Sequence, residues 1–341
     1  MPEPSSLMAG VMLVALVVYT LTGGADFGGG VWDLLASGPR KLEQRRRIAQ
    51  AIAPIWEANH VWLIVVVVVM FVCFPPAFAA VSTVMHIPLT LMLFGIVLRG
   101  TAFVFRAYDP QNEDEATGPW RLVFAVASTI TPIMLGMVLG GITSGTFRFE
   151  PGSMRVSTDF VSEWAAAFPV MVGVYGLALC ALLAAVYLIH DTADAPDLQE
   201  DFRIRALAAA VFTGPLAFGT LAVARLGAPH IYDALVSSSL ALPLHVGTGI
   251  VALGAIGAIW TRRYGVARVL VIAQTMGIFA GLGAAQFPYL VAPQLTFSDA
   301  AAPDHVLWAV LGILCAGGLL LVPAFVWLYS VFKGQSSPRL H

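Results

Sequence analysis

The sequence predicts an all-α integral membrane protein with about nine transmembrane helices. Two observations carry this prediction. Hydrophobic residues make up 58% of the 341 residues and charged residues only 11%, whereas a soluble domain carries about 25% charged residues. The mean hydropathy is +0.83. A chain with so few charges belongs in lipid, and its net charge of −2 offers no basic surface for nucleic acid.

Nine segments are apolar over about the 20 residues needed to cross the hydrocarbon core. The N-terminal sequence MPEPSS lacks the basic residues of a cleaved signal peptide, so we expect the first segment to be retained as a span. The predicted spans are 7–27, 50–73, 85–106, 119–143, 163–189, 206–226, 240–261, 267–290 and 305–332.

Lysine and arginine are concentrated on one side of this predicted topology. The opposite side carries only Arg148, Arg155 and Arg225. Basic loops remain in the cytoplasm, so we expect the N-terminus outside and the C-terminus in the cytoplasm. The basic side consists of the C-terminus and the loops 36–49, 107–118, 190–205 and 262–268.

The first span ends in TLTGGADFGGGVWDLL, residues 20–35. Gly24 and Gly28 have the GxxxG spacing that lets helix backbones approach closely in lipid. Asp26 lies between them, about 28 Å along the helix at about 1.5 Å per residue. Two interpretations stay open at this point. Asp26 is either a helix-end carboxylate in contact with the headgroups, or a carboxylate that faces the bundle interior.

The second span begins near the cytoplasm, after Arg47, and carries WEANHVW within its first turns. Glu57 and His60 share one face, and Trp56 and Asn59 share the adjoining stripe. An ionised group at the bilayer centre costs about 2.5–3.5 kcal/mol on insertion scales. Glu57 is therefore either part of a proton route from cytoplasmic water or part of a structural polar cluster that joins helices.

Arg99 lies toward the cytoplasmic end of the third span, at a depth comparable to those of Asp26 and Glu57. An arginine between two carboxylates would offset the cost of burying them. The alternative is a side chain that extends along the helix to the headgroups.

The remaining histidines do not form a pair of axial haem ligands. His60 lies in the inner half of its span, whereas His86 and His245 lie near the outer ends of theirs. We therefore expect no haem or metal ion to be bound by side chains of this chain. The three cysteines lie in separate apolar runs without a CxxC motif, so we interpret them as core residues.

Three segments carry a resemblance to a known family. GGADFGGGVWDLL, RRRIAQAIAPIWEANHVWLI and FPPAFA resemble subunit II of the cytochrome bd-type quinol oxidases. Arg99-Gly100 and FPYLVAP at 287–293 are also similar to that family, and EANHVW is similar to its cyanide-insensitive branch. One departure is visible. Many members have a second acidic residue three positions before Asp26, where this chain has Gly23.

The resemblance implies two four-helix bundles, at 1–150 and 151–300, and a peripheral ninth helix with a cytoplasmic tail at 301–341. It implies a heterodimer with a haem-bearing subunit I, which holds haems b and d and the quinol-oxidising loop. The complex would lie in the bacterial plasma (inner) membrane, oxidise quinol and reduce O2 to water with cytoplasmic protons. A small single-helix accessory subunit and a structural quinone are further expected partners.

The resemblance also implies roles for individual residues. Glu57 matches the acidic position assigned to proton delivery, and Trp56 would orient it. Asp26 would join the same polar network, together with Asn59 and His60. Trp62 matches a position near a proposed lateral entry for oxygen.

Two other functions compete with an oxidase subunit that supplies a proton path. A proton-coupled secondary transporter should have related halves and a binding site at the membrane midplane. The polar residues here gather in the first half, and the second half has no matching acid within a span, which disfavours transport. The third possibility is a purely structural scaffold for the haem subunit.

Overall fold

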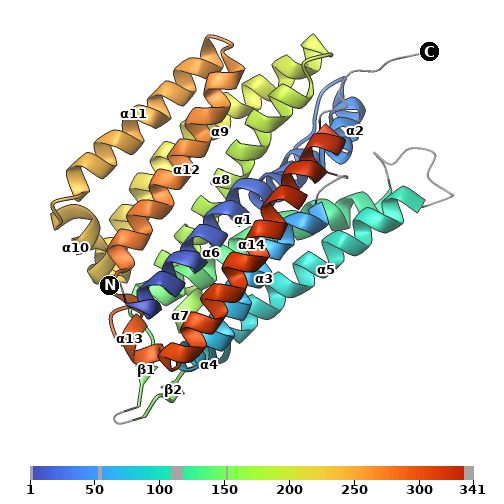
Figure 1. Cartoon of the computed structure of the whole chain (residues 1–341). Coiled ribbons are helices and arrows are strands. Elements are labelled where there is room, and N and C mark those ends of the chain that lie inside the picture. Colours follow the sequence, from blue (N-terminus) through green and yellow to red (C-terminus); the bar gives the residue numbers. More distant parts are fainter. Residues whose placement is uncertain (1–2, 53–55, 109–117, 151–152, 334–341) are drawn as a thin grey trace.

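The computed structural model describes residues 3–52, 56–108, 118–150 and 153–333, and these residues form an almost entirely helical protein (Figure 1). The helices of the first half are α1 (Pro4–Leu34), α2 (Lys41–Ile52), α3 (Trp56–Cys73), α4 (Pro75–Val84), α5 (His86–Tyr108) and α6 (Pro119–Ser144). The helices that follow are α7 (Ser162–Ala165), α8 (Ala167–Asp191), α9 (Pro196–Gly227), α10 (Pro229–Ser237), α11 (Ala241–Trp260), α12 (Tyr264–Gln286), α13 (Phe297–Ala300) and α14 (Asp304–Lys333).

Eight helices in the described part of the chain are long and apolar enough to cross a membrane. The number is nine if α2 and α3 are counted together as one bent span. This result confirms the predicted class, an all-α membrane protein with about nine spans. The only strands in the described residues are two short antiparallel pairs, β1 (Arg148–Phe149) with β2 (Val156–Ser157) and β3 (Tyr289–Val291) with β4 (Leu295–Thr296).

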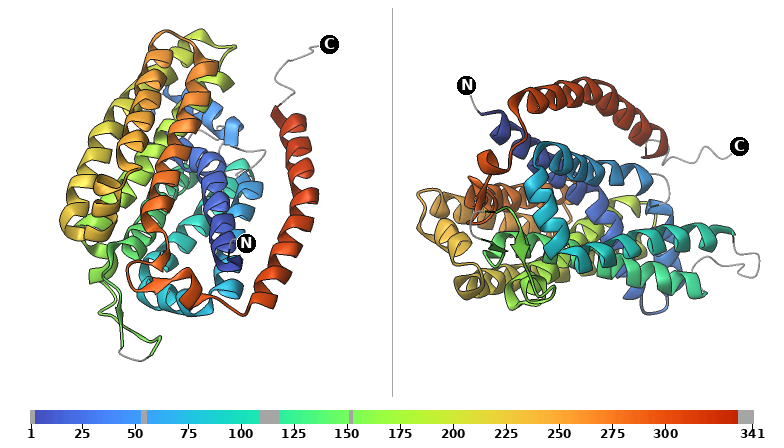
Figure 2. Two further views of the ribbon diagram at one scale, coloured as in Figure 1. Left: turned by 60° about the vertical axis from the view of Figure 1, so that its left-hand side comes forward. Right: turned by 90° about the horizontal axis from the view of Figure 1, so that it is seen from below.

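The long helices form two groups that meet along α1, α6 and α8. Within the first group, α1 packs against α3 and α6, and α6 packs against α5. Within the second group, α8 packs against α9 and α12, and α11 packs against α12. Helix α8 also lies against α1 and α6, so it joins the two groups. Helix α14 contacts α1 and α3 and lies at the edge of the molecule in both views of Figure 2.

Proline and glycine set several of the helix boundaries. Helix α3 ends at Cys73, and Pro75 is the first residue of α4, with Phe74 between them. The Phe-Pro-Pro sequence therefore separates two helices where the span prediction has only a connection. Pro119 begins α6, and Gly145, at a φ of +80°, ends it in the left-handed conformation that glycine adopts without strain.

Helix α1 continues to Leu34, seven residues beyond the predicted end, because its glycines pack against neighbouring helices. A Cβ atom on Gly28 would lie 1.9 Å from the Cys180 carbonyl oxygen in α8. A Cβ atom on Gly30 would lie 2.2 Å from Cβ of Ser128 in α6. Gly24 also faces α8, where its Cβ would lie 3.3 Å from the Cys180 sulfur. The backbone of α1 therefore touches two other helices at positions where no larger side chain fits.

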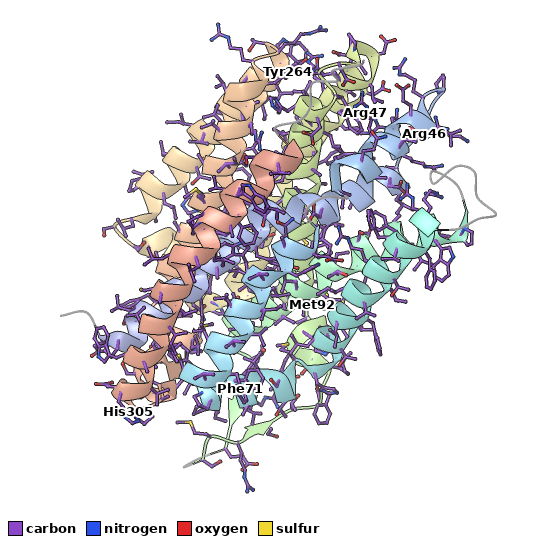
Figure 3. The ribbon with its side chains drawn as sticks, turned by 45° about the vertical axis from the view of Figure 1, so that its right-hand side comes forward. Arg46, Arg47, Phe71, Met92, Tyr264 and His305 are labelled. Atoms are coloured by element: carbon purple, nitrogen blue, oxygen red, sulfur yellow. The ribbon has the colours of Figure 1, made fainter. Side chains whose placement is uncertain are left out.

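Three of the loops predicted to share one side, 36–49, 190–205 and 262–268, lie at the same end of the molecule. Most of the fourth, 107–118, lies outside the described residues. Figure 3 places Arg46, Arg47 and Tyr264 at one end of the bundle, and Phe71 and His305 at the other. We call the first of these the basic end. It contains α2, the α8–α9 connection and the α11–α12 connection.

Ion pairs at the basic end link the two groups of helices. Arg40 donates two hydrogen bonds to Asp201 of α9, from Nε at 2.9 Å and from Nη2 at 2.6 Å. Arg47 of α2 pairs with Asp194 in the α8–α9 connection. Because Arg40 donates two hydrogen bonds to one carboxylate, the contact fixes the relative orientation of the two side chains in addition to pairing their charges.

Candidate functional site: a buried polar network in the first helix group

A hydrogen bond between α1 and α3 forms the centre of the candidate site. Asn59 donates from Nδ2 to Oδ2 of Asp26 over 2.6 Å. Asp26 is 6% exposed and Asn59 is fully buried. A carboxylate removed from water needs such donors, because an unpaired buried charge is costly. The headgroup-contact interpretation of Asp26 does not fit this structure, since α1 continues for two turns beyond the residue.

Arg99 of α5 lies in the same buried region. Its side chain is 1% exposed, and Nε donates to Oγ of Ser128 in α6 over 3.2 Å. The guanidinium lies over the rings of Phe27 and Phe124, with centroid distances of 5.1 and 5.3 Å. Arg99 also interacts electrostatically with Asp26. The aromatic faces and the carboxylate stabilise a cation that cannot reach the headgroups, so the alternative of an extended interfacial arginine does not fit.

Tyr19 and His60 form a second contact between α1 and α3. The Tyr19 hydroxyl lies 3.3 Å from Nδ1 of His60, and the two ring centroids are 5.8 Å apart. The ring of Phe27 contacts both of them, at 6.3 Å from Tyr19 and 6.1 Å from His60. The sequence did not predict Tyr19 as a site residue, because it lies two turns before Asp26 in an apolar run.

Glu57 lies apart from this network. It is exposed in the isolated chain and makes no hydrogen bond or ion pair with the described residues. The reason is helical geometry, because Glu57 and Asn59 are two residues apart and so point about 200° from each other around α3. Of the two carboxylates between which Arg99 was considered, only Asp26 lies in the buried region with Arg99. The side chain of Trp56 lies outside the described residues.

The face of α3 that carries Glu57 is otherwise apolar and uncovered. Ile64 and Phe71 lie two and four turns further along the same face and are 58% and 59% exposed. Val67 and Val68 adjoin them and are also exposed. A single carboxylate thus lies at one end of an apolar surface that this chain leaves free.

A second buried cluster, which the sequence did not predict, lies at the basic end of α1. Asp33 is fully buried, and its carboxylate oxygens lie 3.2 Å from Nη1 of Arg121 and 3.6 Å from Nη2 of Arg106. Arg45 donates to the Asp33 carbonyl over 3.4 Å. The cluster joins α1, α2, α5 and α6. Asp33 lies seven residues after Asp26, two turns along the same face of α1, and this spacing is the signal that could have identified it.

Trp62 packs toward the C-terminal helix. Its ring lies 5.7 Å from that of Phe325 in α14, and Trp62 is half-buried beside Tyr19 and Phe27. Within the described residues, no group of three or more His, Cys, Asp or Glu side chains is arranged to hold a metal ion.

Comparison with known proteins assigns this arrangement to a family. Residues 4–332 match the family described as cytochrome bd terminal oxidase subunit II. The chain belongs to this family. Subunit II is part of a quinol:oxygen oxidoreductase of the respiratory chain, so this chain is a subunit of such an enzyme, in complex with a subunit I that carries the haems. It is a multi-pass protein of the bacterial inner membrane.

Individual relatives agree with this assignment. The chain is 29% identical over 215 residues to the cytochrome bd ubiquinol oxidase subunit 2 of Bacillus subtilis, covering 62% of this chain and 60% of the relative. It is 25% identical to the cytochrome bd-I ubiquinol oxidase subunit 2 of Escherichia coli K12, covering 53% and 46%. The chain thus aligns with about half of the length of these two relatives.

A solved structure shares the fold over nearly the whole chain. The match is to the structure of bd oxidase from Geobacillus thermodenitrificans, with a TM-score of 0.75 and 20% identity, covering 98% of this chain and 99% of the other. The likeness extends over all of the helices described above, so the second helix group belongs to the same fold as the polar network.

Proposed function

We propose that this subunit supports subunit I and supplies part of a cytoplasmic proton path for the reduction of O2 to water. The observation that carries the proposal is the hydrogen bond from Asn59 to Asp26, inside a buried region that also contains Arg99. A hydrogen-bond donor and a nearby cation stabilise the ionised form of a buried carboxylate, so Asp26 can keep its charge inside the bundle and accept a proton from neighbouring water during turnover.

The proposed path starts at the basic end, which we assign to the cytoplasm. Segments rich in lysine and arginine remain on that side of the membrane, and helix α2 at this end carries Arg45, Arg46 and Arg47. The N-terminus then lies outside, and the chain ends in the cytoplasm. Asp26, eight residues from the end of α1, lies about 12 Å inside the helix end.

Glu57 is the proposed link to subunit I. An ionised carboxylate that faced lipid would cost about 2.5–3.5 kcal/mol, and the exposed apolar face of α3 provides a surface for a partner. With that face against subunit I, Asn59 points into this chain and Glu57 points into the partner. Helix α3 then forms the wall between the two subunits. His60 and Trp56 flank the crossing, with Trp56 proposed to orient Glu57.

Other expectations remain proposals of the same kind. We propose that Trp62 lines an entry for oxygen. That entry would lie between α3 and α14, because the ring of Trp62 contacts that of Phe325. We also propose the division of the chain into four-helix bundles at 1–150 and 151–300 and a peripheral helix and tail at 301–341. The proposed partners and cofactors are a structural quinone, haems b and d in subunit I, and a small accessory subunit. We further propose that the chain belongs to the cyanide-insensitive branch.

Proton-coupled transport has less support, because four of the five buried charged residues in the described part of the chain lie in α1 and α5: Asp26, Asp33, Arg99 and Arg106. Only Glu163 lies in the second half.

The test replaces Asp26 by Asn in the complete complex. We expect slower quinol-dependent O2 consumption with unchanged haem absorption, because the path loses its carboxylate while the fold is kept. The control is Glu43→Gln, an exposed acid of α2 outside the network. Normal turnover by D26N, or loss of the haems in that variant, would contradict the proton path. The second result would support the scaffold alone.

A further inference from the structure

A cavity of about 230 Å³ lies between the two helix groups, enclosed by α1, α2, α8 and α12. It is large enough for several water molecules. Five of its lining residues are polar or charged: Thr22, Asp26, Tyr187, Asp191 and Arg268. The other lining residues are aliphatic or glycine.

The polar residues are distributed along the depth of the cavity. Asp191 is the last residue of α8 and Arg268 is the fifth residue of α12, so both lie at the basic end (Figure 1). Arg268 is exposed and Asp191 is half-buried, whereas Asp26 is buried. The cavity thus has charged groups at a solvent-accessible mouth and a carboxylate at its inner wall.

Tyr187 also lines the cavity and is held in place from two directions. Its hydroxyl donates to the Leu21 carbonyl over 3.2 Å, and the Arg268 guanidinium lies 5.0 Å from the centre of its ring. Thr22, one residue further along α1, donates to the Val18 carbonyl over 2.8 Å and keeps lone pairs for water. Apolar cavities of this size remain dry, but the carboxylates of Asp26 and Asp191 line this one and supply polar partners that hold water.

We propose that this cavity is a water-filled inlet through which protons reach Asp26, with Asp191 as the carboxylate that collects them at the mouth. This proposal rests on the proposed proton path, and it adds the point at which protons enter that path. A water molecule in the cavity gives a proton to an Asp26 carboxylate oxygen, and the proton that this water loses is replaced along the water chain from Asp191. Cytoplasmic water then reprotonates Asp191, so each transfer moves one proton without any change in oxidation state.

Two variants test the inlet in the complete complex. Asp191→Asn removes the collecting carboxylate, and Ala51→Phe fills the cavity from α2. We expect each to slow quinol-dependent O2 consumption about tenfold with unchanged haem spectra. This is less than the roughly 100-fold or greater effect of losing a catalytic acid or base, because some water conduction remains. The matched control is Asp194→Asn, an exposed acid three residues beyond Asp191 that pairs with Arg47 instead of lining the cavity.

A second measurement does not depend on turnover. In a variant with the exposed Cys315 replaced by Ser, we expect Thr22→Cys to react with a charged methanethiosulfonate added from the basic side, and we expect Ala51→Phe to block that reaction. Absence of labelling, together with a lipid or quinone that co-purifies in stoichiometric amount, would overturn the inlet. If Ala51→Phe does not assemble, the Asp191→Asn rate and the Thr22→Cys labelling still decide the question.

The results separate the inlet from the proton path as a whole. Normal rates in both Asp191→Asn and Ala51→Phe alongside a slow Asp26→Asn would overturn the inlet and leave the path in place. Normal rates in all three variants would overturn both.

Discussion

Replacing Asp33 by Asn should destabilise the complex more than any exposed charge substitution. The change keeps the size of the side chain and removes one negative charge. Asp33 is fully buried between Arg106, whose side chain is 3% exposed, and Arg121, whose side chain is 17% exposed. After the substitution, two buried guanidinium groups face each other without the carboxylate that separates them. The burial of Arg106 leaves it little access to water.

The magnitude follows from these exposures. Removing one member of a buried ion pair costs about 3–5 kcal/mol, because the remaining charge is uncompensated. Arg121 can regain part of its hydration, so we expect about 3 kcal/mol for Asp33→Asn and a smaller loss for Arg121→Gln. A charge-assisted hydrogen bond contributes about 1.5–3 kcal/mol. In a double-mutant cycle, Asp33 and Arg121 should therefore be coupled by about that amount.

The assay is the thermal and denaturant unfolding of the detergent-solubilised complex, followed by helix content and by haem absorption. Wild type, Asp33→Asn, Arg121→Gln and the double variant are compared under identical lipid and salt conditions. A loss below about 1 kcal/mol for Asp33→Asn, which is typical of surface pairs, would refute this reasoning. Strictly additive losses in the cycle would do so as well.

Three further predictions concern other parts of the fold. Gly28→Leu should prevent assembly, because the new side chain would collide with the backbone of α8. Gly10→Leu in the same helix should assemble normally, since no atom lies within 4 Å of the Cβ position there. The yield of intact complex measures both effects. Asn59→Ala removes the donor to the buried carboxylate and should lower the unfolding free energy by about 1.5–3 kcal/mol. Asp194→Asn should change stability by less than about 1 kcal/mol. The Arg47 guanidinium lowers the pKa of Asp194, so this small contribution is present above about pH 4 and is lost as the pH falls through that lowered pKa. Unfolding measured at pH 7 and at pH 2 would show the loss.

The sequence predicts the spans well because apolar length is a local property. Hydropathy identifies where each long helix lies, and the described residues form eight or nine such helices. It places the end of α1 too early, since the glycines around Gly28 lower the apolar character of the segment although they pack tightly in the structure. What stabilises that helical turn is a contact with α8, which lies far along the chain.

The candidate site is predictable where residues lie close together on one helix. The pairing of Glu57 and His60 on a face follows from spacing, but spacing alone does not say which of Glu57 and Asn59 faces α1. The structure gives that role to Asn59. Asp33 lies in a recognisable motif, yet its partners Arg106 and Arg121 come from other helices, so their contact with Asp33 does not follow from local spacing.

The glycine contacts of α1 also constrain how the protein is made. Trp32 donates from its indole nitrogen to the Ala181 carbonyl, 149 residues later in the chain. At a synthesis rate of about 5–20 residues per second, the glycine-lined side of α1 has no partner from α8 for roughly 7–30 seconds after it leaves the ribosome. During biogenesis that surface is therefore open to lipid or to other nascent helices, and insertion of α8 is the step that closes it.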